Sequence, residues 1–492
     1  MRFHLRSLGT FASVALLIST AACGKKEPVV PVSGVAKPGD TTAVTEENKK
    51  AYDDALKVFV EHDKANDWAE ASCASTAAAF VKVNEDNKKK AGKEMPQALY
   101  NAGLSYQRCN NDPEAKKLFA QTLALDPKFH RAKVQVALYD YKDKGEGALA
   151  GTVEQLQQAV LDAEFQNPDA LVNLAMLQMK RNGSTGDGKS CENDMDCAKR
   201  NIQRALAVDD SFMPAFNQLA LYYLERAKAK AGKTSTKTVT AGKRSKGINQ
   251  QQLELAALVC SQAIRKNPKY APIHNTAGLI QVELGNINGA VAEFRQASQL
   301  DPGFFEAHMN YAAVNLSFRG FKNAEEAFTA ALKIKPQDFD AKLGQALAIR
   351  GQITDANFDE SIKRSQGLLD EAKKIAPERP ETYYNEAILT QEYKVKGITD
   401  PKATIPVYEQ AIGTYNAFIQ KAGSGPEFAD AVKRSRERIK DMQDLIIFVR
   451  DGIKAAEDEA ANPKPPEQLE GLDGPTGGAD APPPAGEKPA PK

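Results

Sequence analysis

Two consecutive stretches of equal length decide the fold. Residues 268–301 read PKYAPIHNTAGLIQVELGNINGAVAEFRQASQLD, and residues 302–335 read PGFFEAHMNYAAVNLSFRGFKNAEEAFTAALKIK. A proline therefore recurs every 34 residues, at Pro268, Pro302 and Pro336. A fixed period of this length indicates stacked copies of one supersecondary unit, because a single copy cannot bury its own apolar face.

Equivalent positions in the two stretches suggest how one unit packs. Gly278 and Ala312 are small enough to let two helices cross closely, and Phe294 and Phe328 supply an aromatic side chain at that crossing. This spacing resembles the tetratricopeptide repeat (TPR), a pair of short helices. The resemblance implies an all-α superhelical solenoid with one concave and one convex surface.

The TPR frame extends over most of the chain once insertions are allowed. We expect about nine helix pairs over residues 46–456, closed by a charged capping helix, with insertions near 182–196 and 226–247. The second insertion holds eight Lys or Arg residues and no acidic residue. It is either a solvated linker or a docking site for an acidic protein, a cell-wall polymer or anionic lipid.

The charge balance and the motifs argue against several functions. The 492 residues include 65 Lys+Arg and 64 Asp+Glu, so the chain offers no strong field for binding nucleic acid. No HExxH, GxSxG or zinc-type Cys/His spacing occurs, so we predict a protein that is not an enzyme, with no cofactor and no metal centre. A calcium site formed by Asp187, Glu192, Asp194 and Asp196 stays open as an alternative to a solvated loop.

The N-terminus has the order of an export signal. Arg2 and Arg6 precede an apolar run that ends in Ala21-Ala22-Cys23, so residues 1–22 are predicted to be a signal peptide. The ending resembles the lipobox of bacterial lipoproteins, which implies that Cys23 is lipidated and, with Gly24 after it, that the protein is sorted to the outer membrane. Residues 23–45 would form a Pro-containing tether and residues 457–492 a disordered acidic, Pro-rich tail.

The remaining five cysteines allow two disulfides in an exported chain. Cys73 and Cys109 fall on elements that touch in a TPR stack, and Cys191 and Cys197 bracket a short polar loop. We expect both pairs to be oxidised, with reduced buried thiols as the alternative. Cys260 takes the packing position of Phe294 and is expected in the core.

The TPR resemblance also implies where a partner would bind. TPR arrays generally bind peptides or proteins in the concave groove, which the fifth, ninth and twelfth residues of each repeat face. The groove residues predicted in this way are Asn275, Leu279, Val282, Met309, Ala313 and Leu316, extended by Tyr100, Leu104 and Gln107. The alternative is that these side chains pack against the neighbouring unit.

The whole layout favours a scaffold in the cell envelope. The lipobox, tether, repeat array and tail together resemble the TPR lipoproteins of bacterial gliding-motility machinery. The resemblance implies a lipid-anchored protein on the periplasmic face of the outer membrane, whose partners are proteins of the motility complex. Two alternatives stay open, namely a lipoprotein chaperone for outer-membrane barrels or pilus secretins, and a cell-wall-binding lipoprotein.

Overall fold

The chain folds as a stack of paired helices. The structure is a computed structural model that describes residues 44–461 except 66, 185, 187–190 and 230–248. All regular elements of this part are helical, and they form nine consecutive α-helix pairs followed by one long helix. The predicted all-α TPR solenoid with a capping helix is therefore confirmed.

The first five pairs are α2 (Glu46–Ala65) with α3 (Glu70–Ala91), α4 (Pro96–Arg108) with α5 (Asp112–Leu125), α6 (His130–Lys144) with α7 (Leu149–Asp162), α8 (Pro168–Arg181) with α9 (Asp194–Val208), and α10 (Met213–Ala229) with α11 (Gln250–Lys266). The last four pairs and the final helix are α12 (Ala271–Glu283) with α13 (Ile287–Leu300), α14 (Phe305–Ser317) with α15 (Phe321–Ile334), α16 (Phe339–Arg350) with α17 (Phe358–Ile375), α18 (Pro380–Glu392) with α19 (Pro401–Ala422), and α20 (Ala429–Ala461). The final helix therefore runs five residues beyond the predicted end of the array at 456.

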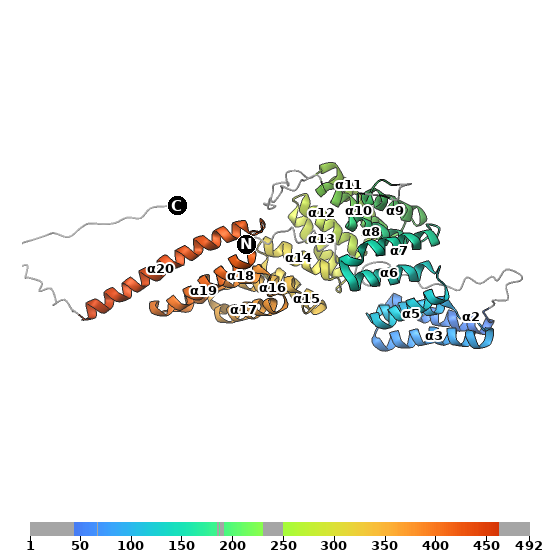
Figure 1. The fold of residues 1–492 in the computed structure, drawn as a ribbon, viewed down its shortest axis with the longest axis horizontal. Helices are drawn as coiled ribbons and strands as arrows, with labels where there is room; N and C mark the ends of the chain where they lie inside the picture. The colour runs from blue at the N-terminus through green and yellow to red at the C-terminus, as the bar shows by residue number, and fades with distance from the viewer. Residues whose placement is uncertain (1–43, 66, 185, 187–190, 230–248, 462–492) are drawn as a thin grey trace, which may run out of the picture.

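Successive pairs stack in the same orientation. The first helix of one pair contacts the first helix of the next from α8 through α10, α12, α14 and α16 to α18. Figure 1 shows the resulting curved array, with α2 and α3 at one end and α20 at the other. Each second helix also contacts the first helix of the following pair, so a continuous core links the units.

In the pairs that are longer than the 34-residue repeat, extra residues occur between the first and the second helix. Short 3₁₀ helices lie between the two helices of a pair at Gly145–Ala148, Asp355–Asn357 and Lys394–Gly397. Along the chain, the connections α8/α9 and α10/α11 also fall between the two helices of one pair. Because the pairs stack in one orientation, the three 3₁₀ helices lie on one edge of the array.

A glycine against a phenylalanine fixes the closest helix crossings. A methyl group added at Gly278 on α12 would lie 2.5 Å from the ring of Phe294 on α13, and one at Gly103 would lie 2.7 Å from Phe119. Both rings are fully buried. Gly344 on α16 is in equally close contact with Phe328 of the preceding pair. The same glycine–phenylalanine contact therefore also joins neighbouring pairs.

The repeat junctions share a hydrogen bond that the repeat spacing does not predict. The Nε2 atoms of His274 and His308 lie 2.9 and 3.0 Å from the carbonyl oxygens of Pro268 and Pro302. The hydroxyl of Tyr383 donates to the Pro377 carbonyl at the equivalent junction, at 3.0 Å. At each of these junctions, a His or Tyr side chain near the start of a first helix therefore hydrogen-bonds to the carbonyl oxygen of the proline that ends the previous unit.

The predicted signal peptide, tether and tail lie outside the described residues, except for the ends of the tether and tail next to the array. Among the described helices, none is both long and apolar enough to cross a lipid bilayer.

We predict opposite effects for two alanine substitutions. Gly278→Ala should lower the free energy of unfolding by roughly 1–3 kcal/mol, because the new methyl group collides with the buried Phe294 ring. Gly367→Ala in α17, where no atom lies within 4 Å of the new methyl group, should raise it by about 0.5–1 kcal/mol. Urea denaturation followed by circular dichroism measures both. Equal effects of the two substitutions would contradict the packing account.

We also predict a pH-dependent contribution from His274. Burial disfavours its charged form, but hydrogen bonds with Glu293 (Nδ1–Oε2, 2.7 Å) and the Pro268 carbonyl raise its pKa above 6.5. Both ring nitrogens then act as donors. The stabilisation is present below pH 6.5 and is lost as the pH rises through the folded-state pKa.

His274→Gln should therefore lower the unfolding midpoint more at pH 5.5 than at pH 8.5. Glu293→Gln should show the same trend, because it removes the carboxylate that holds the proton. Thermal unfolding at the two pH values is the measurement, and an equal loss at both would refute the assignment.

Candidate partner-binding surfaces

The predicted concave-groove residues lie almost entirely inside the array. Seven of the nine are buried: Tyr100, Leu104, Asn275, Leu279, Val282, Met309 and Ala313. Gln107 and Leu316 are half-buried. The structure therefore corrects the prediction for those seven residues, which offer no surface to a partner.

The reason is the close approach of neighbouring units. Leu279 and Val282 of α12 share one apolar cluster with Ala313 of α14, and Tyr100 and Leu104 belong to the cluster that joins α2 to α6. Asn275 is also engaged, because its Oδ1 accepts a hydrogen bond from Asn310 at 2.8 Å. These side chains hold one unit to the next.

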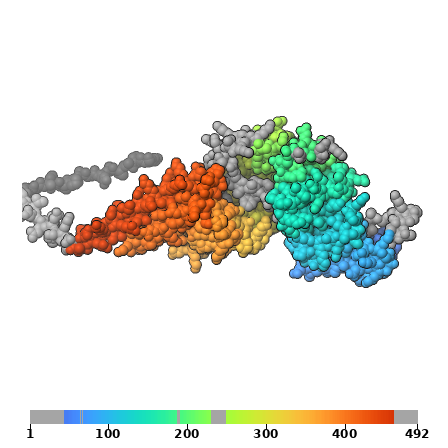
Figure 2. Space-filling view, in the orientation of Figure 1, coloured from blue at the N-terminus to red at the C-terminus, as the bar shows by residue number. Residues whose placement is uncertain are grey.

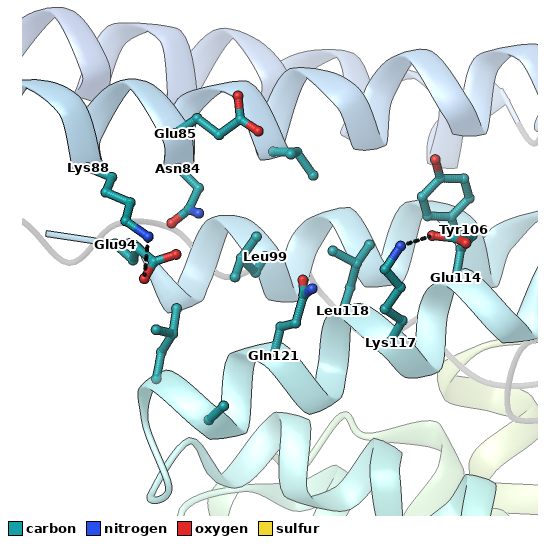
Figure 3. A pocket seen from close by; sticks show the side chains of 13 residues that line it. Asn84, Glu85, Lys88, Glu94, Leu99, Tyr106, Glu114, Lys117, Leu118 and Gln121 are labelled. Atoms are coloured by element: carbon teal, nitrogen blue, oxygen red, sulfur yellow. Dashed lines mark hydrogen bonds and ion pairs between the residues drawn. The ribbon is translucent and has the colours of Figure 1, made fainter.

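An open furrow lies between two second helices instead. It has a volume of about 590 Å³ and lies between α3 and α5, over the outward side of α4 (Figure 3). Its apolar lining includes Val81 from α3, Leu99 and Tyr106 from α4, and Leu118 and Leu125 from α5. A volume of this size is in the range of small-ligand and peptide-side-chain pockets.

Charged side chains of both signs line the rims of the furrow. Lys88 pairs with Glu94 at 3.3 Å at one end, and Lys117 pairs with Glu114 at 3.3 Å at the other (Figure 3). These pairs are solvent-exposed to a large degree, so each stabilises the fold by at most about 1 kcal/mol. They can exchange for ion pairs with a bound chain.

Local hydrogen bonds set the shape of the furrow. Asn84 of α3 is buried, and its Oδ1 accepts the backbone N–H of Met95 at 2.6 Å. Asn87 donates to the Lys93 carbonyl at 2.9 Å. Two asparagines of α3 therefore fix the turn into α4, which sets the separation of α3 and α4 at this end of the furrow.

The furrow can hold an extended or helical protein segment that carries a few apolar side chains flanked by charges. The TPR resemblance does not predict this furrow, because it places the partner groove on the first helix of each pair. The sequence feature that could have indicated the furrow is the pair of apolar residues Leu118 and Leu125 on α5. They are one heptad apart on the same side of the helix, with the polar Gln121 between them.

The four predicted disulfide cysteines come together in the predicted pairs. Cys73 of α3 is bonded to Cys109 at the end of α4, with a Cα–Cα distance of 6.3 Å. Cys191 is bonded to Cys197 in α9, with a Cα–Cα distance of 5.0 Å. Cys260 is a buried free thiol whose pKa is raised by burial, which keeps it protonated and unreactive.

The two acidic residues in the first turn of α9 accept hydrogen bonds that stabilise the turn into this helix. Asp194 is fully buried and accepts bonds from Arg181 (Nε, 2.8 Å; Nη2, 2.6 Å) and from the backbone N–H of Gly183 (2.7 Å). The Asp196 carboxylate accepts the N–H of Glu192 at 3.2 Å. Asp187 and Cys23 lie outside the described residues. In the part of the chain that the structure describes, no group of three or more His, Cys, Asp or Glu side chains could hold a metal ion.

Comparison with known proteins identifies the repeat. Residues 271–304, which cover α12 and α13, match the tetratricopeptide repeat family. The predicted TPR resemblance is therefore confirmed for the unit from which the period was read.

A curated relative is the Hsp70-Hsp90 organizing protein of Triticum aestivum, which is 28% identical over 134 residues. The match covers 27% of this chain and spans only 22% of the relative. Among solved structures, a thermophilic TPR protein of Thermus thermophilus is 24% identical, with 45% of this chain and 99% of that chain covered and a TM-score of 0.35. A TPR protein of Parabacteroides merdae is 15% identical, with 64% and 98% covered and a TM-score of 0.33.

We predict that filling the furrow prevents partner binding. Gln121→Trp places an indole in the furrow from an exposed position on α5, so the helical content and melting point should not change while proteins that cross-link to the chain are lost. Gln155→Trp, on the exposed side of α7, is the matched control and should keep those proteins. Identical cross-linking profiles for both variants would exclude the furrow as the binding surface.

Proposed function

We propose that this TPR chain is a non-enzymatic scaffold that binds segments of other proteins. The observation that carries the proposal is the furrow between α3 and α5, because it combines an apolar floor with ion-paired rims on a rigid frame of helices. The disulfide between Cys73 and Cys109 connects α3 to the end of α4, so it holds one wall of the furrow against its floor. A fixed furrow binds a segment without the cost of ordering the receptor.

The insertions extend the same proposal. They all connect the two helices of a pair, and insertions of repeat proteins commonly gather on one face, which is often the binding face. A scaffold with a furrow at one end and insertions in several pairs can hold more than one protein at a time. Simultaneous binding at linked sites raises the effective concentration of each partner.

The proposal also places the scaffold at the outer membrane. The support is the sequence alone, namely the export signal, the lipobox-type ending at Cys23 and Gly24 after it. A lipid on Cys23 and a tether of about 20 residues would hold the array near the membrane surface on its periplasmic face. The gliding-motility complex is the assembly that the whole-chain layout favours, so its proteins are the proposed partners.

A second candidate function is that of a chaperone for outer-membrane barrels or pilus secretins. The relative from Triticum aestivum favours it, since its name describes a protein that organises Hsp70 and Hsp90. The two functions differ in outcome. Deletion of a chaperone lowers the amount of assembled barrels or secretins, whereas deletion of a motility scaffold leaves them intact and stops movement.

The test of membrane anchoring is Cys23→Ser. We expect this variant to leave the outer-membrane fraction, because the thioether that carries the lipid cannot form. Proteins cross-linked to the wild-type chain in intact cells should be lost with it, while the purified variant keeps the circular-dichroism spectrum of the array. Unchanged sedimentation of Cys23→Ser with the outer membrane would count against the lipid as the attachment.

A further inference from the structure

The last helix of the array exposes apolar side chains where a cap is expected to be polar. Helix α20 packs on α19 through a buried face that includes Val432, Met442 and Ile446. The side of α20 that this packing does not cover carries Phe448, 75% exposed, and Leu445, 44% exposed. Figure 2 shows α20 at the end of the molecule that lies farthest from α2 and α3. Terminal units of repeat proteins need a polar outer face for solubility. Exposed apolar residues at this end therefore indicate an interaction surface.

The exposed face of α20 has a symmetric pattern. Its stripe, hereafter the α20 stripe, consists of Arg434, Asp441, Leu445, Phe448, Gly452 and Glu459, all of which are exposed. The intervals between these residues are 7, 4, 3, 4 and 7, which place them on one side of a helix. The intervals read the same from either end. Two copies of such a stripe align when the helices run antiparallel about the midpoint between Leu445 and Phe448.

The side chains that meet in this alignment are complementary. Each Leu445 lies opposite Phe448 of the second copy, and each Arg434 lies opposite Glu459 of the second copy. Asp441 lies opposite Gly452, which leaves room for its hydrated carboxylate. All three contacts occur twice, as a two-fold symmetric interface requires.

The charge along α20 favours the antiparallel direction. Residues 429–443 hold five Lys or Arg and three acidic residues, whereas residues 444–461 hold two Lys or Arg and five acidic residues. An antiparallel pair places the basic half of each helix beside the acidic half of the other. A parallel pair would place like charges together.

Contacts within the chain leave the stripe accessible. Arg438 pairs with Glu392 at 2.7 Å, and Arg450 pairs with Glu409 at 2.9 Å, so these two arginines face the body of the array. The guanidinium of Arg434 donates only to the carbonyl of Asp430, one turn earlier on the same helix, at 3.2 Å among the described contacts.

From these observations we infer that two copies of this chain dimerise through antiparallel pairing of their α20 stripes. On each helix the α20 stripe runs from Arg434 to Glu459, a distance of 25 residues or roughly 37 Å at 1.5 Å per residue. The dimer surface is separate from the furrow on α3 to α5, so the dimer would present two furrows to its partners.

Sedimentation velocity over a concentration series tests the dimer. The sample is the full chain carrying Cys23→Ser, so that no lipid drives association. This parent should sediment as a dimer that dissociates on dilution. Phe448→Ser should weaken the dimer roughly 100-fold, because the ring is buried twice in the symmetric interface. Ile447→Ser is the matched control: Ile447 is 57% exposed on the same helix but lies off the stripe, so the dimer should remain.

A charge exchange tests the orientation. Arg434→Glu should weaken the dimer by tenfold or more, since it faces Glu459 of the second copy, and Arg434→Glu with Glu459→Arg should restore it. A monomer at all concentrations would overturn the proposal, as would failure of the double variant to restore association or an equal effect of Ile447→Ser and Phe448→Ser. If the α20 stripe instead binds another protein or the chain's own tail, the parent is monomeric and the proposal is wrong.

Discussion

The close crossing of two helices over a buried phenylalanine is the contact on which the rest of the structure depends. Phe294 reaches the backbone of α12 only because Gly278 has no side chain, and Phe119 meets Gly103 in the same way. Each helix pair then becomes a flat unit whose faces are apolar. The next pair must cover one of those faces, so the geometry of one crossing, repeated along the chain, produces the solenoid.

The same tight packing decides where a partner can bind. Side chains such as Tyr100 and Leu279, which the repeat frame assigns to a groove, are used to hold neighbouring units together. Among the described residues, accessible surface includes the furrow between α3 and α5 and the outer face of α20. A rigid interior and accessible outer surfaces suit a scaffold, because binding then costs little reorganisation of the receptor.

The sequence predicts features that repeat and misses features that depend on neighbours. The 34-residue period, the small residue at Gly278 and the aromatic Phe294 predict the fold, since each unit meets the same packing requirement. The Cys73–Cys109 pair follows from the adjacency of successive units, and the Cys191–Cys197 pair follows from the short polar loop between the two residues. Exposure of Leu279 or Tyr100 could not be predicted, because it depends on how closely the adjacent pair approaches. The furrow depends in turn on Asn84 holding the turn between two units, a hydrogen bond that no repeat pattern encodes.

The central claim is that the chain binds a segment of another protein in the furrow between α3 and α5. The most direct measurement is photo-cross-linking in intact cells with benzoylphenylalanine in place of Gln121, compared with the same residue in place of Gln155 on α7. The account predicts discrete adducts with other proteins at position 121 and none at position 155. No adduct at position 121, or the same adducts at both positions, would contradict it.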